Sequence, residues 1–130
     1  MTDDAPIRSH RDLTVWRKAM DVARDVYALT DHLPRKEEFR MTAQLIRAAI
    51  SIPANIGEGN ARGSRKDYAY FINIARGSAA ELETLLTLVV ETQLAPAARV
   101  NELLSRVEEV GRMLNGLRRS LESKSLIPNP

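Results

Sequence analysis

The chain of 130 residues contains no cysteine, which excludes disulfide bonds, thiolate zinc sites and thiol nucleophiles. Histidine is nearly as scarce, since only His10 and His32 are present. Neither has a carboxylate at the helical spacing of a metal site, so we expect two surface histidines and no bound metal. Ser–His chemistry fits equally poorly. We therefore expect a protein that is not an enzyme and that uses no cofactor.

Long apolar runs are also missing from the sequence. The first ten residues include Asp3, Asp4 and Pro6, which argues against a signal peptide or a membrane anchor at this end. Elsewhere no stretch reaches the ~18 uncharged apolar residues of a membrane span. Together with the lack of cysteine, this pattern predicts a cytoplasmic protein with no membrane partner.

The charge excess is small, because 19 Lys and Arg stand against 17 Asp and Glu, for a net charge of +2. Such a balance permits association with nucleic acid without requiring it. The length fits one domain and is short for two.

Apolar side chains recur every three or four residues in two segments of the first half, which is the helical period. The first segment covers residues 13–30, with Asp12 as its expected N-cap. A second helix is expected from near Glu37, where Pro53 either kinks it or divides it in two.

Glycines 57 and 59 are expected to end that second helix. With Gly63 they resemble a phosphate-binding loop, but no GxxxxGK[ST] motif or preceding strand accompanies them. An interhelical turn is the better interpretation.

The second half of the chain predicts two longer helices. Residues 65–93 are apolar on nearly every side, and Ser64 with Asp67 suits the start of a helix with a side-chain cap. Pro96 suits the first turn of the last helix. That helix carries the clearest repeat in the chain, formed by Val100, Leu103, Val107, Val110, Leu114, Leu117 and Leu121.

Four helices joined by short loops predict an all-α fold, an antiparallel up-down-up-down four-helix bundle. We expect the bundle to occupy residues 12–122. Residues 1–11 are expected to form a flexible N-terminal arm, and residues 123–130 a flexible tail.

Polar residues within the apolar helices form a first set of candidate site residues, because buried polar groups need internal partners. The set comprises Asn55, Glu58, Arg76 and Glu81. We expect Arg76 to pair with Glu58 across helices in a structural network rather than a catalytic one. Replacing a buried, paired Arg76 by Ala would then destabilise the fold strongly.

Basic residues near two expected turns form the candidate nucleic-acid-binding set. Arg35, Lys36 and Arg40 precede the second helix, and Arg62, Arg65 and Lys66 precede the third. An up-down bundle places these turns at opposite ends. Either group alone is more typical of a solvated surface than of a binding site, but an oligomer multiplies each group by its subunit number.

Two helices carry more apolar surface than one protomer is expected to cover. The residues concerned are Val15, Trp16, Val22, Ala23, Tyr27 and Leu29 in the first helix, and Tyr70, Ile74 and Leu88 in the third. We therefore expect a homo-oligomer rather than a monomer.

Three segments, residues 12–30, 47–64 and 74–86, carry a family resemblance. The motif formed by Ser51, Ile52, Pro53, Asn55, Ile56, Glu58 and Gly59 is its most distinctive part. These segments resemble the four-helix bundle family named after the 23S rRNA intervening sequence, over about residues 12–121. Arg40 stands where that family commonly has Gly, and Ile46 replaces a frequent Arg, which moves positive charge along the chain.

The resemblance implies an antiparallel four-helix bundle that assembles into a barrel-like homopentamer. The family is related to the accessory variability determinant of diversity-generating retroelements, a protein that works with a reverse transcriptase and nucleic acid. The resemblance implies no catalytic residues. Two functions follow as hypotheses: an oligomeric accessory factor associated with RNA or DNA, with a reverse transcriptase or other protein as a further partner, or an oligomeric scaffold that binds no nucleic acid.

Overall fold

The computed structural model describes residues 13–126. Four long helices dominate this part of the chain: α1 (Thr14–Thr30), α2 (Ala43–Ala61), α3 (Arg65–Glu91) and α4 (Ala97–Leu126). A short 3-10 turn, η2 (Arg35–Glu37), and a π-helical turn, η3 (Glu38–Thr42), lie between α1 and α2. No strand occurs among the described residues, so the all-α prediction is confirmed.

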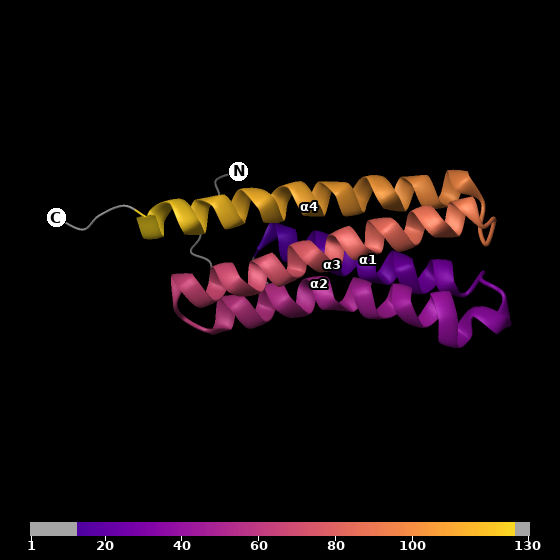
Figure 1. Cartoon of the computed structure of the whole chain (residues 1–130), viewed down its shortest axis with the longest axis horizontal. Helices are drawn as coiled ribbons and strands as arrows, with labels where there is room; N and C mark the ends of the chain where they lie inside the picture. Colours follow the sequence, from indigo (N-terminus) through magenta and orange to yellow (C-terminus); the bar gives the residue numbers. More distant parts are fainter. Residues whose placement is uncertain (1–12, 127–130) are drawn as a thin grey trace.

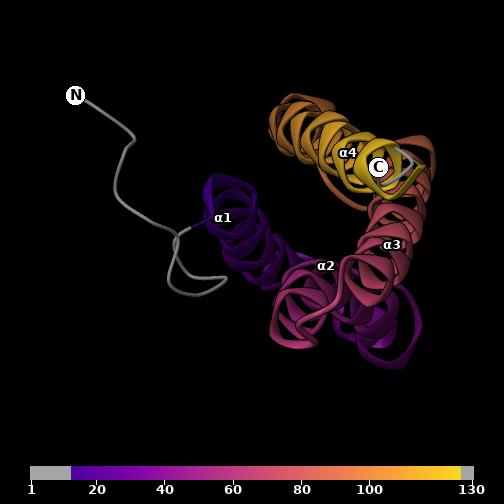
Figure 2. The ribbon, with the colours of Figure 1, turned by 90° about the vertical axis from the view of Figure 1, so that its left-hand side faces the viewer.

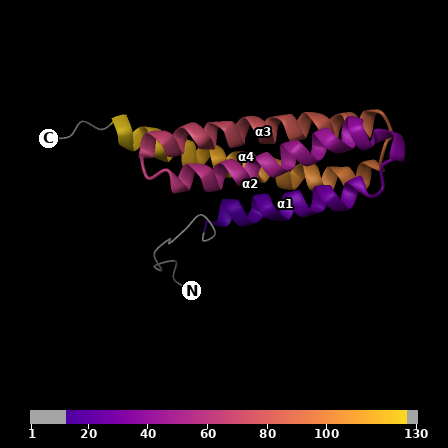
Figure 3. The same cartoon turned by 90° about the horizontal axis from the view of Figure 1, so that it is seen from below.

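Consecutive helices run in opposite directions and form an elongated rod (Figures 1 and 3). Seen along the rod, the helices follow one another around a common core in chain order (Figure 2). The α2–α3 and α3–α4 pairs pack most extensively, and the α1–α4 pair packs least. This is the predicted up-down-up-down bundle. The predicted arm, residues 1–11, lies outside the described residues, and α4 continues past the predicted boundary at residue 122.

The apolar repeat of the last helix faces the core as predicted. Six of its seven members are at most 8% exposed, and Leu117 is half-buried against the same core. Such a stripe drives packing because burying apolar surface contributes roughly 25 cal/mol per Å². Within residues 13–126, no helix is long and apolar enough to cross a membrane.

The path into α2 differs from the prediction. The helix was expected from Glu37, but the chain first makes the η2 and η3 turns, and the backbone of Arg40 leaves helical geometry at φ −114° and ψ −106°. Regular helix begins only at Ala43 and then continues through Pro53 without a break. The interruption therefore lies at Arg40, and Pro53 does not divide the helix.

The predicted end of α2 at Gly57 and Gly59 is also wrong, because the helix runs on to Ala61. Gly59 lies inside the helix, where a Cβ atom would stand 2.8 Å from the Cβ of Phe71. Its lack of a side chain allows α3 to approach closely. The turn instead uses Gly63, whose φ of +84° suits glycine.

Of the predicted helix caps, the one at the start of α3 is confirmed. Ser64 caps α3 as predicted, since its Oγ accepts a hydrogen bond of 3.1 Å from the backbone N–H of Asp67. The expected cap Asp12 lies outside the described residues, and α1 has Leu13 at its N-cap position with no side-chain cap. Pro96 directly precedes α4.

The surplus apolar surface of the first helix is smaller than expected. Val15, Val22, Ala23 and Leu29 are all buried within the protomer. Only Tyr27, 50% exposed, remains largely open, while Trp16 is half-buried. The α3 surface is as expected, because Tyr70, Ile74 and Leu88 all remain exposed.

The close α2–α3 contact predicts the effect of adding one methyl group. In the variant Gly59→Ala, the new Cβ meets Phe71 and Tyr68, so unfolding midpoints in heat and denaturant should fall, by about 1–3 kcal/mol of stability. Gly116→Ala is the matched control. Its Cβ meets no atom within 4 Å, and it should leave stability unchanged or raise it by up to about 1 kcal/mol. Equal effects of the two variants would contradict the close approach.

Candidate functional site

The first basic cluster, Arg35, Lys36 and Arg40, lies on the η2 and η3 turns, and all three side chains are exposed. Between them, the Glu37 carboxylate is only 8% exposed. It accepts a hydrogen bond of 3.3 Å from the backbone N–H of Met41 and pairs with the Arg40 guanidinium at 3.5 Å. Glu37 thus ties the turn to the start of α2 and orients Arg40, whose side chain remains 69% exposed.

The second basic cluster, Arg62, Arg65 and Lys66, surrounds the α2–α3 turn, and its side chains are also exposed. Arg62 is held in place, because its Nε donates to Glu58 over 2.8 Å and its guanidinium lies 4.9 Å from the centre of the Phe71 ring. Arg65 and Lys66 occupy the first turn of α3, where the helix dipole adds positive potential. Glu58, which pairs with Arg62, and Asp67, in the same first turn of α3, offset part of this positive charge.

The two basic clusters are not brought together within one protomer. The α1–α2 turn and the α2–α3 turn lie at opposite ends of the rod (Figure 1). Between them α2 runs for 19 residues, a length of about 28 Å. One chain therefore presents its two basic clusters at separate ends.

The expected pairing of Arg76 with Glu58 is not formed. Glu58 pairs with Arg62 on its own helix, and Arg76 donates a hydrogen bond of 3.0 Å to Asn73. Glu81 is exposed. Arg76 is only partly buried and lines the α3–α4 groove, so its removal strands no buried carboxylate. The reason to expect a strong loss of stability from Arg76→Ala therefore disappears.

A different polar contact links α2 to α3, and of the predicted set it includes only Asn55. The Ser51 and Ser78 hydroxyls lie 2.7 Å apart across the two helices. Asn55 Nδ2 donates to Ser51 Oγ at 3.0 Å and to the Ser51 carbonyl at 2.8 Å. In the sequence, the small side chain of Ser78 beside other small residues indicates a close helix contact. It does not indicate which helix or residue is the partner.

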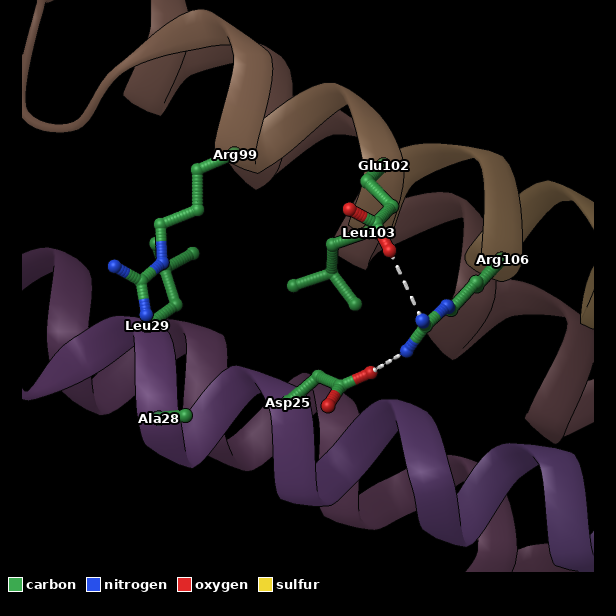
Figure 4. Close-up of a pocket in the computed structure, with 7 residues that line it drawn as sticks. All are labelled: Asp25, Ala28, Leu29, Arg99, Glu102, Leu103 and Arg106. Atoms are coloured by element: carbon green, nitrogen blue, oxygen red, sulfur yellow. Dashed lines mark hydrogen bonds and ion pairs between the residues drawn. The ribbon is translucent and has the colours of Figure 1, made fainter.

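One surface cavity lies between α1 and α4, with a volume of about 180 Å³ (Figure 4). In it the Arg106 guanidinium points toward α1, where it bonds Asp25, and it also donates to Glu102 over 3.1 Å. Arg99 adds a second cation at the same groove. Two cations thus face two carboxylates, and this balance offers no excess charge to hold an ionic ligand.

The α3–α4 groove contains the one carboxylate with a shifted titration in this region. Burial raises the pKa of Glu83 above its ordinary value, and the nearby Glu108 carboxylate raises it further. Arg76 and Arg112 line the same groove. These groups lack a nucleophile or a third acidic ligand. Throughout residues 13–126 no group of three or more His, Cys, Asp or Glu side chains could hold a metal ion.

Comparisons with known proteins agree on one family. The family model for the 23S rRNA-intervening sequence protein matches residues 11–116. A crystal structure of a protein of unknown function from the S23 ribosomal protein family, from Bacteroides thetaiotaomicron, is 28% identical, with a TM-score of 0.77. The match covers 82% of this chain and 99% of that one. No curated protein matches the chain.

The raised pKa of Glu83 predicts a pH-dependent effect on stability. A carboxyl group whose pKa is raised by folding favours the native state while protonated, and this contribution is lost as the pH rises through the raised value. Glu83→Gln removes the ionised form, so its melting temperature should exceed that of the wild type at pH 7. The advantage should vanish below the ordinary carboxyl pKa of about 4.3.

Thermal unfolding across pH measures this difference, with Glu81→Gln as the control. Glu81 is exposed on the same helix, so its variant should follow the wild-type curve at every pH. A Glu83→Gln variant that melts below the wild type at pH 7 would contradict the role given to burial and Glu108.

Proposed function

This chain belongs to the 23S rRNA-intervening sequence protein family, and we propose that it acts as a non-enzymatic homo-oligomer that associates with nucleic acid. The observation that carries the proposal is the division of its surface. The basic clusters lie at the two ends of the rod (Figure 1), whereas the α1–α2 apolar groove and three exposed apolar side chains of α3 lie along its flanks. Ends and flanks can therefore serve different partners.

The first apolar flank is the groove between α1 and α2. Trp16 and Met20 line it from α1, and Ile50, Ala54 and Gly57 line it from α2. Ile50 is 42% exposed even though it is a large aliphatic side chain. Apolar grooves of this kind exclude water best when a second apolar surface fills them.

The second apolar flank lies on α3. Tyr70 and Ile74 are separated by four residues and Leu88 follows fourteen later, so all three lie on one side of the helix. They are 62%, 37% and 41% exposed. Because the two flanks are different surfaces on different helices, a groove on one protomer and the α3 side of the next would form a head-to-tail interface, the type that closes into rings.

Such a ring would align the rods side by side, gathering the copies of the first basic cluster at one end and those of the second at the other. Phosphate binding gains from this arrangement, since each neutralised phosphate releases counterions. Five subunits are the number that the family resemblance implies. A cytoplasmic location, which the composition of the sequence suggests, and a protein partner such as a reverse transcriptase, which the resemblance implies, are further parts of the proposal.

Nucleic-acid association is tested by titrating labelled single-stranded and duplex oligonucleotides across a range of salt. The affinity should fall steeply as salt rises, because binding is dominated by cations on phosphates. The double variant Arg65→Ala, Lys66→Ala should bind more weakly, and its slope of log affinity against log salt should become shallower. Each lost phosphate contact should remove about 0.7–0.9 from that slope.

Arg24→Ala serves as the control, since Arg24 lies midway along α1 and pairs with Asp21. Its slope should equal that of the wild type. A wild-type protein that binds neither form of nucleic acid at low salt would reject nucleic-acid association and leave the scaffold as the better account.

Assembly is tested separately by light scattering. The wild type should give a mass several times the 14.5 kDa of one chain, with five subunits favoured. Ile74→Glu places a charge on the α3 flank and should lower the mass. Ser105→Glu, an exposed site on α4, should not change it. A wild-type mass of 14.5 kDa at micromolar concentration would overturn the oligomer.

A further inference from the structure

Phe39 is the most exposed of the large apolar side chains that the structure describes. Its side chain is 88% exposed, compared with 62% for Tyr70, the next most exposed. A phenyl ring left in water loses the free energy that burial would give it, so such a position is unusual in a protein with an available core. The same short segment, residues 35–40, also contains the three cations of the first basic cluster.

The backbone that carries Phe39 is anchored on both sides. Leu33 and Glu37 are buried before it, and Leu45 is fully buried after it. The Glu37 carboxylate accepts the Met41 N–H, which ties together the residues on either side of the ring. Phe39 therefore projects from a structured turn, the π-helical segment η3, and its exposure does not come from a frayed end.

This combination has a chemical counterpart. An aromatic face stacks on any base that is not already stacked or paired, and such contacts are sequence-tolerant. Cations beside it can neutralise the phosphates on either side of that base. Glu37, the buried carboxylate of the segment, is already paired with Arg40, and Asp31 and Glu38 are exposed carboxylates of the same connection between α1 and α2.

We infer that Phe39 is a stacking platform for an unpaired base of single-stranded nucleic acid, with Arg35, Lys36 and Arg40 binding the adjacent phosphates. The inference rests on the proposed function and adds the strandedness of the ligand and the residue that selects it. Duplexes are disfavoured at this site because their base faces are covered by stacking within the helix.

The position of the turn favours nucleic acid over a second protein copy as the occupant. The α1–α2 turn lies at one end of the rod (Figures 1 and 3), whereas the α1–α2 groove of the first apolar flank lies farther along the two helices. Side-by-side assembly would therefore leave this end open. At the other end, the Phe71 ring lies beneath the Arg62 guanidinium and contacts the Tyr70 ring edge-on, while Tyr70 itself is 62% exposed.

The test compares three substitutions at Phe39 in the full chain, using dye-labelled oligothymidylate, oligouridylate and a duplex of equal length at one salt concentration. Phe39→Ala should weaken binding of both single strands at least about five-fold and leave the duplex unchanged, because one stacked base is lost. Phe39→Leu keeps an apolar side chain without a ring face and should behave like Phe39→Ala. Phe39→Trp should retain binding, and its added fluorescence should be quenched by either single strand.

Controls separate this inference from the proposed function. Tyr27→Ala removes an exposed aromatic ring from α1, outside both basic clusters and both apolar flanks, and should retain full single-strand binding. Light scattering and melting curves of each variant should match the wild type, since Phe39 covers no core surface. If the wild type binds single strands and Phe39→Ala binds them equally well, the stacking platform is wrong while nucleic-acid association stands.

Two further outcomes would also overturn the inference. If Phe39→Leu retains full affinity, or if Phe39→Ala lowers the oligomer mass, the ring makes an apolar protein contact and does not stack on a base. If the wild type binds no nucleic acid at low salt, both the inference and the proposed function fail.

Discussion

The close contact between α2 and α3 is the constraint on which the other features of the rod depend. Gly59 brings the backbone of α2 against Phe71 and Tyr68, and the Ser51–Ser78 hydrogen bond joins the same two helices farther along. These contacts set how far each helix can slide past the other. The register between α2 and α3 therefore positions these two helices directly. Because α3 also packs extensively on α4, the same register influences the rest of the bundle through shared core contacts.

The same constraint separates the chemistry of the ends from that of the sides. An uninterrupted α2 keeps the two basic turns at opposite ends, and the interruption at Arg40 falls outside its regular part. The grooves then differ in kind: the α1–α4 groove is charged and internally neutralised, whereas the α1–α2 groove is mostly apolar. The basic clusters thus lie at the ends of the rod, and the apolar groove lies along a flank.

Apolar periodicity made the helices and their order predictable, because the repeat from Val100 to Leu121 and the Ser64 cap reflect local rules that the tertiary structure does not override. The end of α2 was not predictable from Gly57 and Gly59, since glycine at a close helix contact looks the same in sequence as glycine at a turn. The Arg76–Glu58 pairing failed for a related reason. Each residue found a partner one turn away on its own helix, and periodicity does not reveal which face a partner helix covers. The exposure of Phe39 depends on the π-helical turn, which carries no clear sequence signal.

The central claim, that nucleic acid meets this protein at the ends of the rod, is tested most directly by photocrosslinking to an oligonucleotide that carries 4-thiouridine, followed by mass spectrometry of the adducts. The account predicts adducts on residues 35–40 and on residues 62–70, and few along the middle of the helices. Adducts concentrated in the α1–α4 groove around Arg99 and Arg106, or a protein that forms none, would contradict it.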